Sequence, residues 1–311
     1  MLFAMSIIPV VIILIFIYKK DKKEKEPLGL LIGLFFAGMA TVITALIGEV
    51  VGELIFDAIW PYDSALRQFL MAMLIVAPAE ELGKYMVLRL ITWKNKNFNY
   101  SYDAIVYAVF VSLGFAAFEN IGYVFMNGFG TAILRMFTAV PGHASFAVLM
   151  GYFYSRAKYA SLTNNKSDYS KNIALTILIP IIGHGLYDGI IFGSSTSESI
   201  LVTLSGIFIW FGFVVTLFVL SIITIVKASK NDFCIVYYPG NVQALYMPSF
   251  GGEWICGCGM INSLNFCSRC GSMRPDVGGM WYCPSCGSPS SYNFCGCCGF
   301  PKPAVHPQIQ A

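Results

Sequence analysis

The chain has 311 residues, of which 57% are hydrophobic and 12% are charged, and its mean hydropathy is +0.67. Because soluble domains carry about 25% charged residues, this composition excludes an ordinary soluble protein and indicates an integral membrane protein. The formal net charge of +3 says little by itself, since the distribution of basic residues among the loops matters more.

Seven apolar runs are long enough to span a bilayer, which takes about 17–25 residues. They cover 2–18, 29–56, 66–91, 102–127, 131–156, 172–193 and 200–226. We therefore predict an all-α polytopic membrane protein with about seven transmembrane helices in residues 1–230. In the second run, the pairs Gly29/Gly33 and Gly48/Gly52 have the spacing that allows close helix packing.

Basic residues cluster in alternate loops of this arrangement. The other loops, near 57–65, 127–131 and 193–199, are acidic or uncharged. The positive-inside rule then predicts a multi-pass protein of the cell membrane with its N-terminus outside and its C-terminus in the cytoplasm. The basic residues are Lys19, Lys20, Lys22, Lys23, Lys25, Arg89, Lys94, Lys96, Arg156, Lys158, Lys166, Lys171, Lys227 and Lys230.

All ten cysteines follow the last apolar run, and nine of them lie between Cys256 and Cys298. They form two copies of about 28 residues, each with a tryptophan, two closely spaced cysteines, eight further residues and a Cys-x-x-Cys pair. Four thiolates in two knuckles match tetrahedral structural zinc, and cytoplasmic thiols stay reduced, which disfavours disulfides. We predict two zinc ions held by Cys256, Cys258, Cys267, Cys270, Cys283, Cys286, Cys295 and Cys298.

These cysteines define a small cytoplasmic tandem zinc-ribbon domain at 254–303, after a linker at 231–253 and before a flexible tail at 304–311. From residue 231 onward the basic and acidic side chains balance. Since nucleic-acid binding rests on a basic surface, a protein partner or a regulatory role is favoured over nucleic acid. The charged residues are Arg269, Arg274 and Lys302 against Asp232, Glu253 and Asp276.

Ionisable residues interrupt four of the apolar runs. A charge at bilayer depth costs roughly 2.5–3.5 kcal/mol on insertion scales, so a set of them indicates a polar site inside the membrane. Counted from the outer helix ends, the four runs place these groups at similar depth, near mid-membrane and slightly outward. The residues are Glu80, Glu81, Lys84, Glu119, His143, His184 and Asp188.

Proline accompanies three of these runs. Pro78 precedes Glu80, Pro141 precedes His143, and Pro180 precedes His184 by four residues. Proline removes a backbone donor and bends a helix, and irregular backbone at membrane depth is tolerated where it lines a wet cavity. We expect kinks beside the ionisable groups.

Peptide hydrolysis suits this set of side chains. Glu80 is the predicted general base toward water, and Glu81 is expected to orient a partner group. Glu119, His143 and His184 either hold a metal that activates water or form a metal-free acid–base and oxyanion network. No His-Glu-x-x-His motif occurs, so a zincin-type site is absent.

The motifs Glu80-Glu81-x-x-Lys84, Phe115-x-x-x-Glu119, His143 and His184-x-x-x-Asp188 resemble those of the PrsW intramembrane proteases, in the CAAX-protease and bacteriocin-processing superfamily. The resemblance covers about residues 28–226. It implies endoproteolysis of membrane-anchored substrates, such as anti-sigma factors, with the site at Glu80, Glu81, Glu119, His143, His184 and Asp188. The prenyl-protein endopeptidase branch would have histidine at position 119 and asparagine at 188, so CAAX processing is disfavoured.

Two alternatives remain open at this point. An ion- or proton-coupled transporter would also use buried carboxylates and histidines, and a non-catalytic scaffold could recruit partners through the zinc ribbons. Glu49 and Glu53 form a same-face pair near the outer end of the second run, with some chance of touching the site. Arg67 and Arg135 lie near outer helix ends and are expected to reach the membrane interface.

Overall fold

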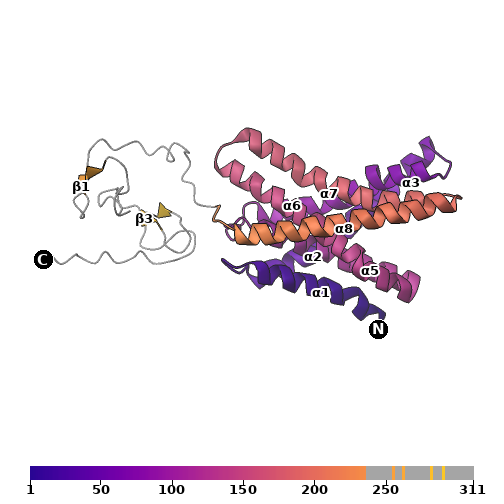
Figure 1. The fold of residues 1–311 in the computed structure, drawn as a ribbon, viewed down its shortest axis with the longest axis horizontal. Coiled ribbons are helices and arrows are strands. Elements are labelled where there is room, and N and C mark those ends of the chain that lie inside the picture. Colours follow the sequence, from indigo (N-terminus) through magenta and orange to yellow (C-terminus); the bar gives the residue numbers. More distant parts are fainter. Residues whose placement is uncertain (236–253, 256–260, 263–280, 283–288, 291–311) are drawn as a thin grey trace. The chain divides into compact units, whose positions relative to one another are not determined.

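The computed structural model describes residues 1–235 and four short strand segments at 254–255, 261–262, 281–282 and 289–290. The chain divides into two compact units, one of Met1–Ser161 with Lys166–Phe233 and the other of Leu162–Asn165 with Cys234–Ala311. The first unit is a bundle of long helices (Figure 1).

Each of the seven predicted runs is helical. Five helical stretches are long and apolar enough to cross a membrane, and one of them, Asp103–Leu162, contains two helices. The remaining run is divided into three assigned pieces. The helices are α1 (Leu2–Lys20), α2 (Leu28–Ile59), α3 (Ala65–Met71), the π-helical turn η1 (Ala72–Val76), α4 (Ala77–Thr92), α5 (Asp103–Phe137), α6 (Ala139–Leu162), α7 (Lys166–Ser195) and α8 (Ile200–Lys230).

Pro78 explains the π-helical turn that precedes the glutamate pair. A proline ring clashes with the carbonyl four residues earlier, here that of Leu74, and η1 contains this residue. The wider turn accommodates the ring and places Glu80 in the first turn of α4. Pro141 lies in the first turn of α6, where backbone N–H groups have no intrahelical partner, whereas α7 continues through Pro180 as one helix.

Gly128 breaks α5 and reverses the direction of the chain. Its φ of 80° and ψ of −159° lie in a region that is essentially restricted to glycine. In a straight helix, Glu119 and Arg135 would be separated by about 24 Å, yet their side chains form an ion pair. The segment 129–137 therefore folds back, and the predicted helix at 131–156 is wrong in its bounds, because α6 begins only at Ala139.

Glycines bring α2 against the helix that carries the glutamate pair. A methyl group at Gly48 would lie 2.9 Å from Cβ of Ala79, and one at Gly52 would also collide with the facing helical stretch. The predicted pair Gly29 and Gly33, in contrast, has nothing within 4 Å. Close packing is thus confirmed at the second pair and wrong at the first.

Arg67 is held in the connection between α2 and α3, and its predicted position at the membrane interface stays a prediction. It is buried, and its guanidinium pairs with Asp57 while Nε donates to the Trp60 carbonyl at 3.1 Å. Because the connection between α2 and α3 is short, these acceptors lie within reach of the side chain. Arg67 therefore closes this turn.

Two short antiparallel hairpins lie in the second unit. Strand β1 (Trp254–Ile255) pairs with β2 (Ile261–Asn262), and β3 (Trp281–Tyr282) pairs with β4 (Pro289–Ser290). Each hairpin begins at the tryptophan that opens one copy of the duplicated segment. All eight predicted zinc-ligand cysteines lie outside the described residues.

Candidate active site

Four helices bring the predicted polar residues into one connected network. Glu80, Glu81 and Lys84 come from α4, Glu119 from α5, His143 from α6, and His184 and Asp188 from α7. The side chains of Glu119 and Asp188 are 18% and 15% exposed, whereas the other five are almost completely buried. The network is therefore most accessible from the side of these two carboxylates.

Lys84 lies at the centre of the network. Its ammonium donates to Glu80 Oε2 at 2.9 Å and to Glu81 Oε1 at 2.7 Å, and it lies 3.3 Å from His143 Nδ1. The same ammonium lies 3.9 Å from the ring centre of Phe115. A buried ammonium in contact with two carboxylates compensates charge that would otherwise be costly at this depth.

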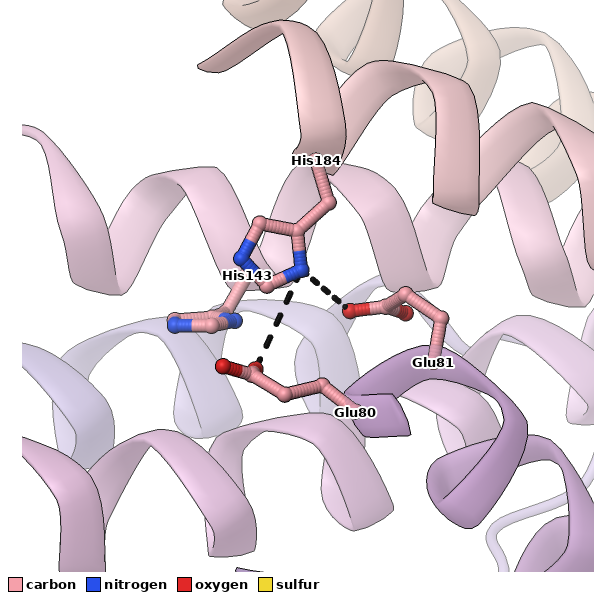
Figure 2. Close-up of side chains that lie close together, drawn as sticks. All are labelled: Glu80, Glu81, His143 and His184. Atoms are coloured by element: carbon pink, nitrogen blue, oxygen red, sulfur yellow. Dashed lines mark hydrogen bonds and ion pairs between the residues drawn. The ribbon is translucent and has the colours of Figure 1, made fainter. Parts of the chain in front are cut away.

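His184 connects the glutamate pair to Asp188. Its Nδ1 lies 2.9 Å from Glu81 Oε1 and 3.8 Å from Glu80 Oε2, while Nε2 lies 3.2 Å from Asp188 Oδ2. Figure 2 shows Glu80 and Glu81 of α4 both facing one nitrogen of the His184 ring. The ring also stacks on Phe146, with centroids 5.0 Å apart, which fixes its orientation.

His143 is held in a comparable way by Glu119. Its Nε2 lies 2.9 Å from Glu119 Oε2, and its Nδ1 faces the Lys84 ammonium. An ammonium is only a donor, so Nδ1 accepts and Nε2–H donates to Glu119. The two imidazoles are nearly perpendicular, with centroids 5.2 Å apart.

Arg135 belongs to the site, although the sequence analysis expected it at the interface. Its Nη2 donates to Glu119 Oε2 at 2.7 Å and its Nε donates to Asn120 Oδ1 at 2.9 Å. The sequence analysis placed Arg135 near the outer end of a separate helix at 131–156, whereas residues 129–137 end α5 and bring this side chain beside Glu119. The Asn127-Gly128 dipeptide is a turn signal, and it lies at the loop that the sequence analysis placed near 127–131.

Glu49 lies at the margin of the site, whereas Glu53 lies on the exposed surface of α2. Glu49 is half-buried on α2 and is close enough to interact electrostatically with Glu119 and Asp188. Glu53, one turn further along α2, is exposed. The pair is therefore split between the edge of the site and the outer surface.

Four residues of this network could hold a metal ion. Glu80, Glu81, His143 and His184 each offer one ligand atom, and these atoms lie within 4.8 Å of one another. The group differs from the predicted set of Glu119, His143 and His184, because Glu119 contacts the far nitrogen of His143.

The chemistry of this donor set fits a divalent metal. Each histidine directs Nδ1 toward the group and Nε2 toward an outer carboxylate, which is how metal-binding imidazoles are usually oriented. The second oxygen of Glu81 is buried without a hydrogen-bond partner, and carboxylate and imidazole are ligands for zinc. Lys84 contacts three of the same four residues and so competes with an ion for them.

A polytopic helical bundle with buried glutamates, histidines and a lysine has the groups that an intramembrane hydrolase needs. Residues 26–223 match the PrsW family, described as PrsW family intramembrane metalloprotease. The chain belongs to this family and is an intramembrane protease. The resemblance noted from the motifs is confirmed, and the transporter and scaffold alternatives are not favoured.

Curated relatives agree with this assignment. The chain is 34% identical over 226 residues to Protease PrsW of Oceanobacillus iheyensis, covering 73% of this chain and 95% of the relative. It is 31% identical to Protease PrsW of Clostridioides difficile, covering 67% and 87%, and 28% identical to that of Bacillus subtilis, covering 67% and 90%. No solved structure matches the chain at a significant level.

Proposed function

We propose that this intramembrane protease hydrolyses peptide bonds of membrane-anchored proteins with Glu80 as the general base toward water. The observation that carries the proposal is the convergence of a glutamate pair, a lysine and two histidines from separate helices in a buried network. Buried carboxylates with such neighbours can accept the proton of an attacking water.

Glu80 is the better base of the pair because its partners constrain it less. Its Oε2 accepts from Lys84, but His184 Nδ1 is 3.8 Å away. Glu81 Oε1 contacts both Lys84 and His184 below 3.0 Å. Glu81 is thus suited to position these two groups, while Glu80 is free to reach water.

The two outer carboxylates have a positioning role in this proposal. Glu119 orients His143 and Asp188 orients His184, each through Nε2. His184, whose Nδ1 faces the glutamate pair, can then donate to the oxyanion that develops on the scissile carbonyl, which is often the largest contribution to catalysis. His143 accepts from Lys84 at Nδ1 and therefore helps to hold that ammonium in place. Because Glu119 and Asp188 are the partly exposed members, the substrate would approach from their side.

A metal at this site would be held by Glu80, Glu81, His143 and His184, and zinc is the ion we propose. When bound, such a metal polarises a carbonyl and lowers the pKa of water. With or without a metal, Lys84 balances the charge of the glutamate pair, and Glu119 and Asp188 hold the imidazoles. The chain itself supplies the dry surroundings, since every ligand residue is buried.

The remaining assignments rest on the sequence. We propose an anti-sigma-factor-like membrane-anchored substrate, an N-terminus outside the cell and a cytoplasmic C-terminus. Eight of the nine cysteines in residues 254–303, all except Cys297, are proposed to bind two zinc ions, and this segment is proposed to form a module for a protein partner. Their duplicated pattern, with one hairpin at the start of each copy, supports this.

The test combines metal content with cleavage. The purified full chain and its His143→Ala/His184→Ala variant are measured by elemental mass spectrometry and incubated in liposomes with a membrane-anchored reporter protein. Three zincs per chain in the wild type and two in the variant would support the intramembrane zinc. Two in both would place no zinc there, and failure of the wild type to cleave any membrane-anchored reporter would contradict the proposed substrate class.

A further inference from the structure

Asp21, Glu26 and Asp103 form a second buried group of carboxylates outside the active site. Asp21 follows α1, Glu26 precedes α2, and Asp103 is the first residue of α5. One oxygen of each lies within 4.8 Å of the others, and the three residues are at most 2% exposed. Since Asp103 and Glu119 lie 16 residues apart on α5, about 24 Å of helix separates this group from the active site.

Several oxygens of this group lack partners. Both carboxylate oxygens of Asp21 and Oδ1 of Asp103 are buried without a hydrogen bond of ordinary distance and angle, and the backbone N–H of Glu26 interacts with the Asp21 carboxylate outside that geometry. Glu26, in contrast, accepts from the Tyr107 hydroxyl. Buried polar atoms are normally satisfied, so the free oxygens of Asp21, directed into a group of carboxylates, point to an additional ligand.

Positive charge from the protein does not compensate the group directly. In the part of the chain that the structure describes, no lysine or arginine forms an ion pair with these three carboxylates. The Lys25 ammonium donates to the backbone carbonyls of Tyr18 and Asp21 and acts on the Asp21 carboxylate at longer range. Asp232, just after α8, adds a fourth negative group nearby.

The electrostatics agree with this geometry. Burial raises the pKa of Asp21 to about 7, with Lys25 opposing the shift and Asp232 adding to it. Burial likewise raises the pKa of Glu26 to about 7, while the hydrogen bond from Tyr107 opposes the shift. Carboxylates in this situation are stabilised when a proton or a cation neutralises them.

We propose that Asp21, Glu26 and Asp103 bind one hard divalent cation, Ca²⁺ or Mg²⁺, where the α1–α2 connection meets the start of α5. The donors are carboxylate oxygens, which these ions prefer, whereas zinc sites in proteins typically use histidine or cysteine. The buried, unpartnered hydroxyl of Tyr102 adds an oxygen near Asp21. The ion fastens the N-terminal helix to α5, which carries Glu119.

The test measures thermal unfolding and calorimetric binding of the full chain in detergent, after dialysis against buffer free of Ca²⁺ and Mg²⁺. A cation that binds only the folded state raises Tm in proportion to the logarithm of its concentration. We expect this for at least one of the two ions, and the titrations distinguish them. In Asp21→Asn, the apparent affinity should fall at least tenfold.

Asp21→Asn is a suitable variant because its carboxylate has no well-formed hydrogen bond to lose. Without divalent cation it should therefore unfold at the same temperature as the wild type or higher, since it removes a buried negative charge. Glu24→Gln, in the same connection but exposed, is the matched control and should keep the wild-type response. His143→Ala/His184→Ala should also keep it, which separates this site from the active site.

Two outcomes would overturn the proposal. The first is that neither ion shifts Tm or gives binding heat at millimolar concentration, which would mean that protons alone neutralise the group. The second is an equal response in the wild type and in Asp21→Asn/Asp103→Asn, which would place the binding elsewhere. Neither outcome bears on the proposed proteolysis, because the cleavage assay uses different residues.

Discussion

Glu80→Gln is the sharpest perturbation of the proposed mechanism. The substitution is nearly isosteric, keeps an acceptor for the Lys84 ammonium at the position 2.9 Å away, and removes the capacity to accept a proton from water. A general base contributes about 10²–10⁴-fold, which corresponds to about 2.7–5.4 kcal/mol in the activation free energy. We expect the cleavage rate to fall by that factor.

Stability should change much less than activity. Lys84 retains Glu81 at 2.7 Å, so no buried charge is left without a partner, and a charged acceptor becomes a neutral one. Hydrogen bonds of the two kinds differ by roughly 1 kcal/mol. The Tm of Glu80→Gln should therefore lie within a few degrees of the wild type.

The assay compares initial cleavage rates of one membrane-anchored reporter by wild type, Glu80→Gln and Glu53→Gln in liposomes. Glu53 is an exposed glutamate on α2, and its substitution should leave the rate unchanged. Each protein is also melted to confirm that it is folded. A folded Glu80→Gln protein that retains more than about a tenth of the wild-type rate would refute the role of Glu80 as base.

Arg135→Gln should lower both the cleavage rate and the unfolding free energy, because Glu119 loses its charged partner. The loss of unfolding free energy should be about 1–3 kcal/mol, and Arg135→Lys should lose less of both quantities. A melting curve of Arg135→Gln that matches the wild type would contradict this. Gly128→Ala should lower the unfolding free energy by about 1–3 kcal/mol, because the backbone conformation at this position disfavours alanine although the space around it is open. Gly130→Ala, in the same segment, is the control and should be tolerated. Chemical denaturation of both variants measures the difference. Lys84→Met should destabilise the fold by about 3–5 kcal/mol, because it leaves the glutamate pair without its ammonium. If these glutamates bind metal, added zinc should restore part of the lost stability in thermal melts. Equal melting temperatures with and without zinc would argue against that ion.

The helices and the set of ionisable residues inside them could be predicted from the sequence because both signals are local. A run of apolar residues is long enough to span a bilayer or it is not, and an ionisable residue inside such a run is costly enough to indicate a function. The motif around Glu80, that around Glu119, His143 and the His184–Asp188 pair were therefore visible before any packing was known.

The tertiary structure decided which of these residues touch. The reversal at Gly128 brings Arg135 to Glu119, whereas its place near the end of an apolar run had predicted that this arginine reaches the interface. The approach of the Lys84 ammonium to His143 of α6 likewise depends on helix packing, which spacing within one helix does not report, whereas its contacts with Glu80 and Glu81 lie within α4.

The group of Asp21, Glu26 and Asp103 is the clearest case of contacts that the sequence does not reveal. Asp21 and Glu26 lie in a short connection whose sequence is rich in charge, and Asp103 lies far along the chain, so nothing in their spacing marks them as neighbours. Sequence by itself determined that this protease is a multi-pass helical membrane protein and which ionisable side chains lie in its apolar runs, because hydropathy and side-chain type are properties of single residues and short windows. Long-range packing decided which of those groups from different helices come into contact, because burial and distance are properties of the folded chain.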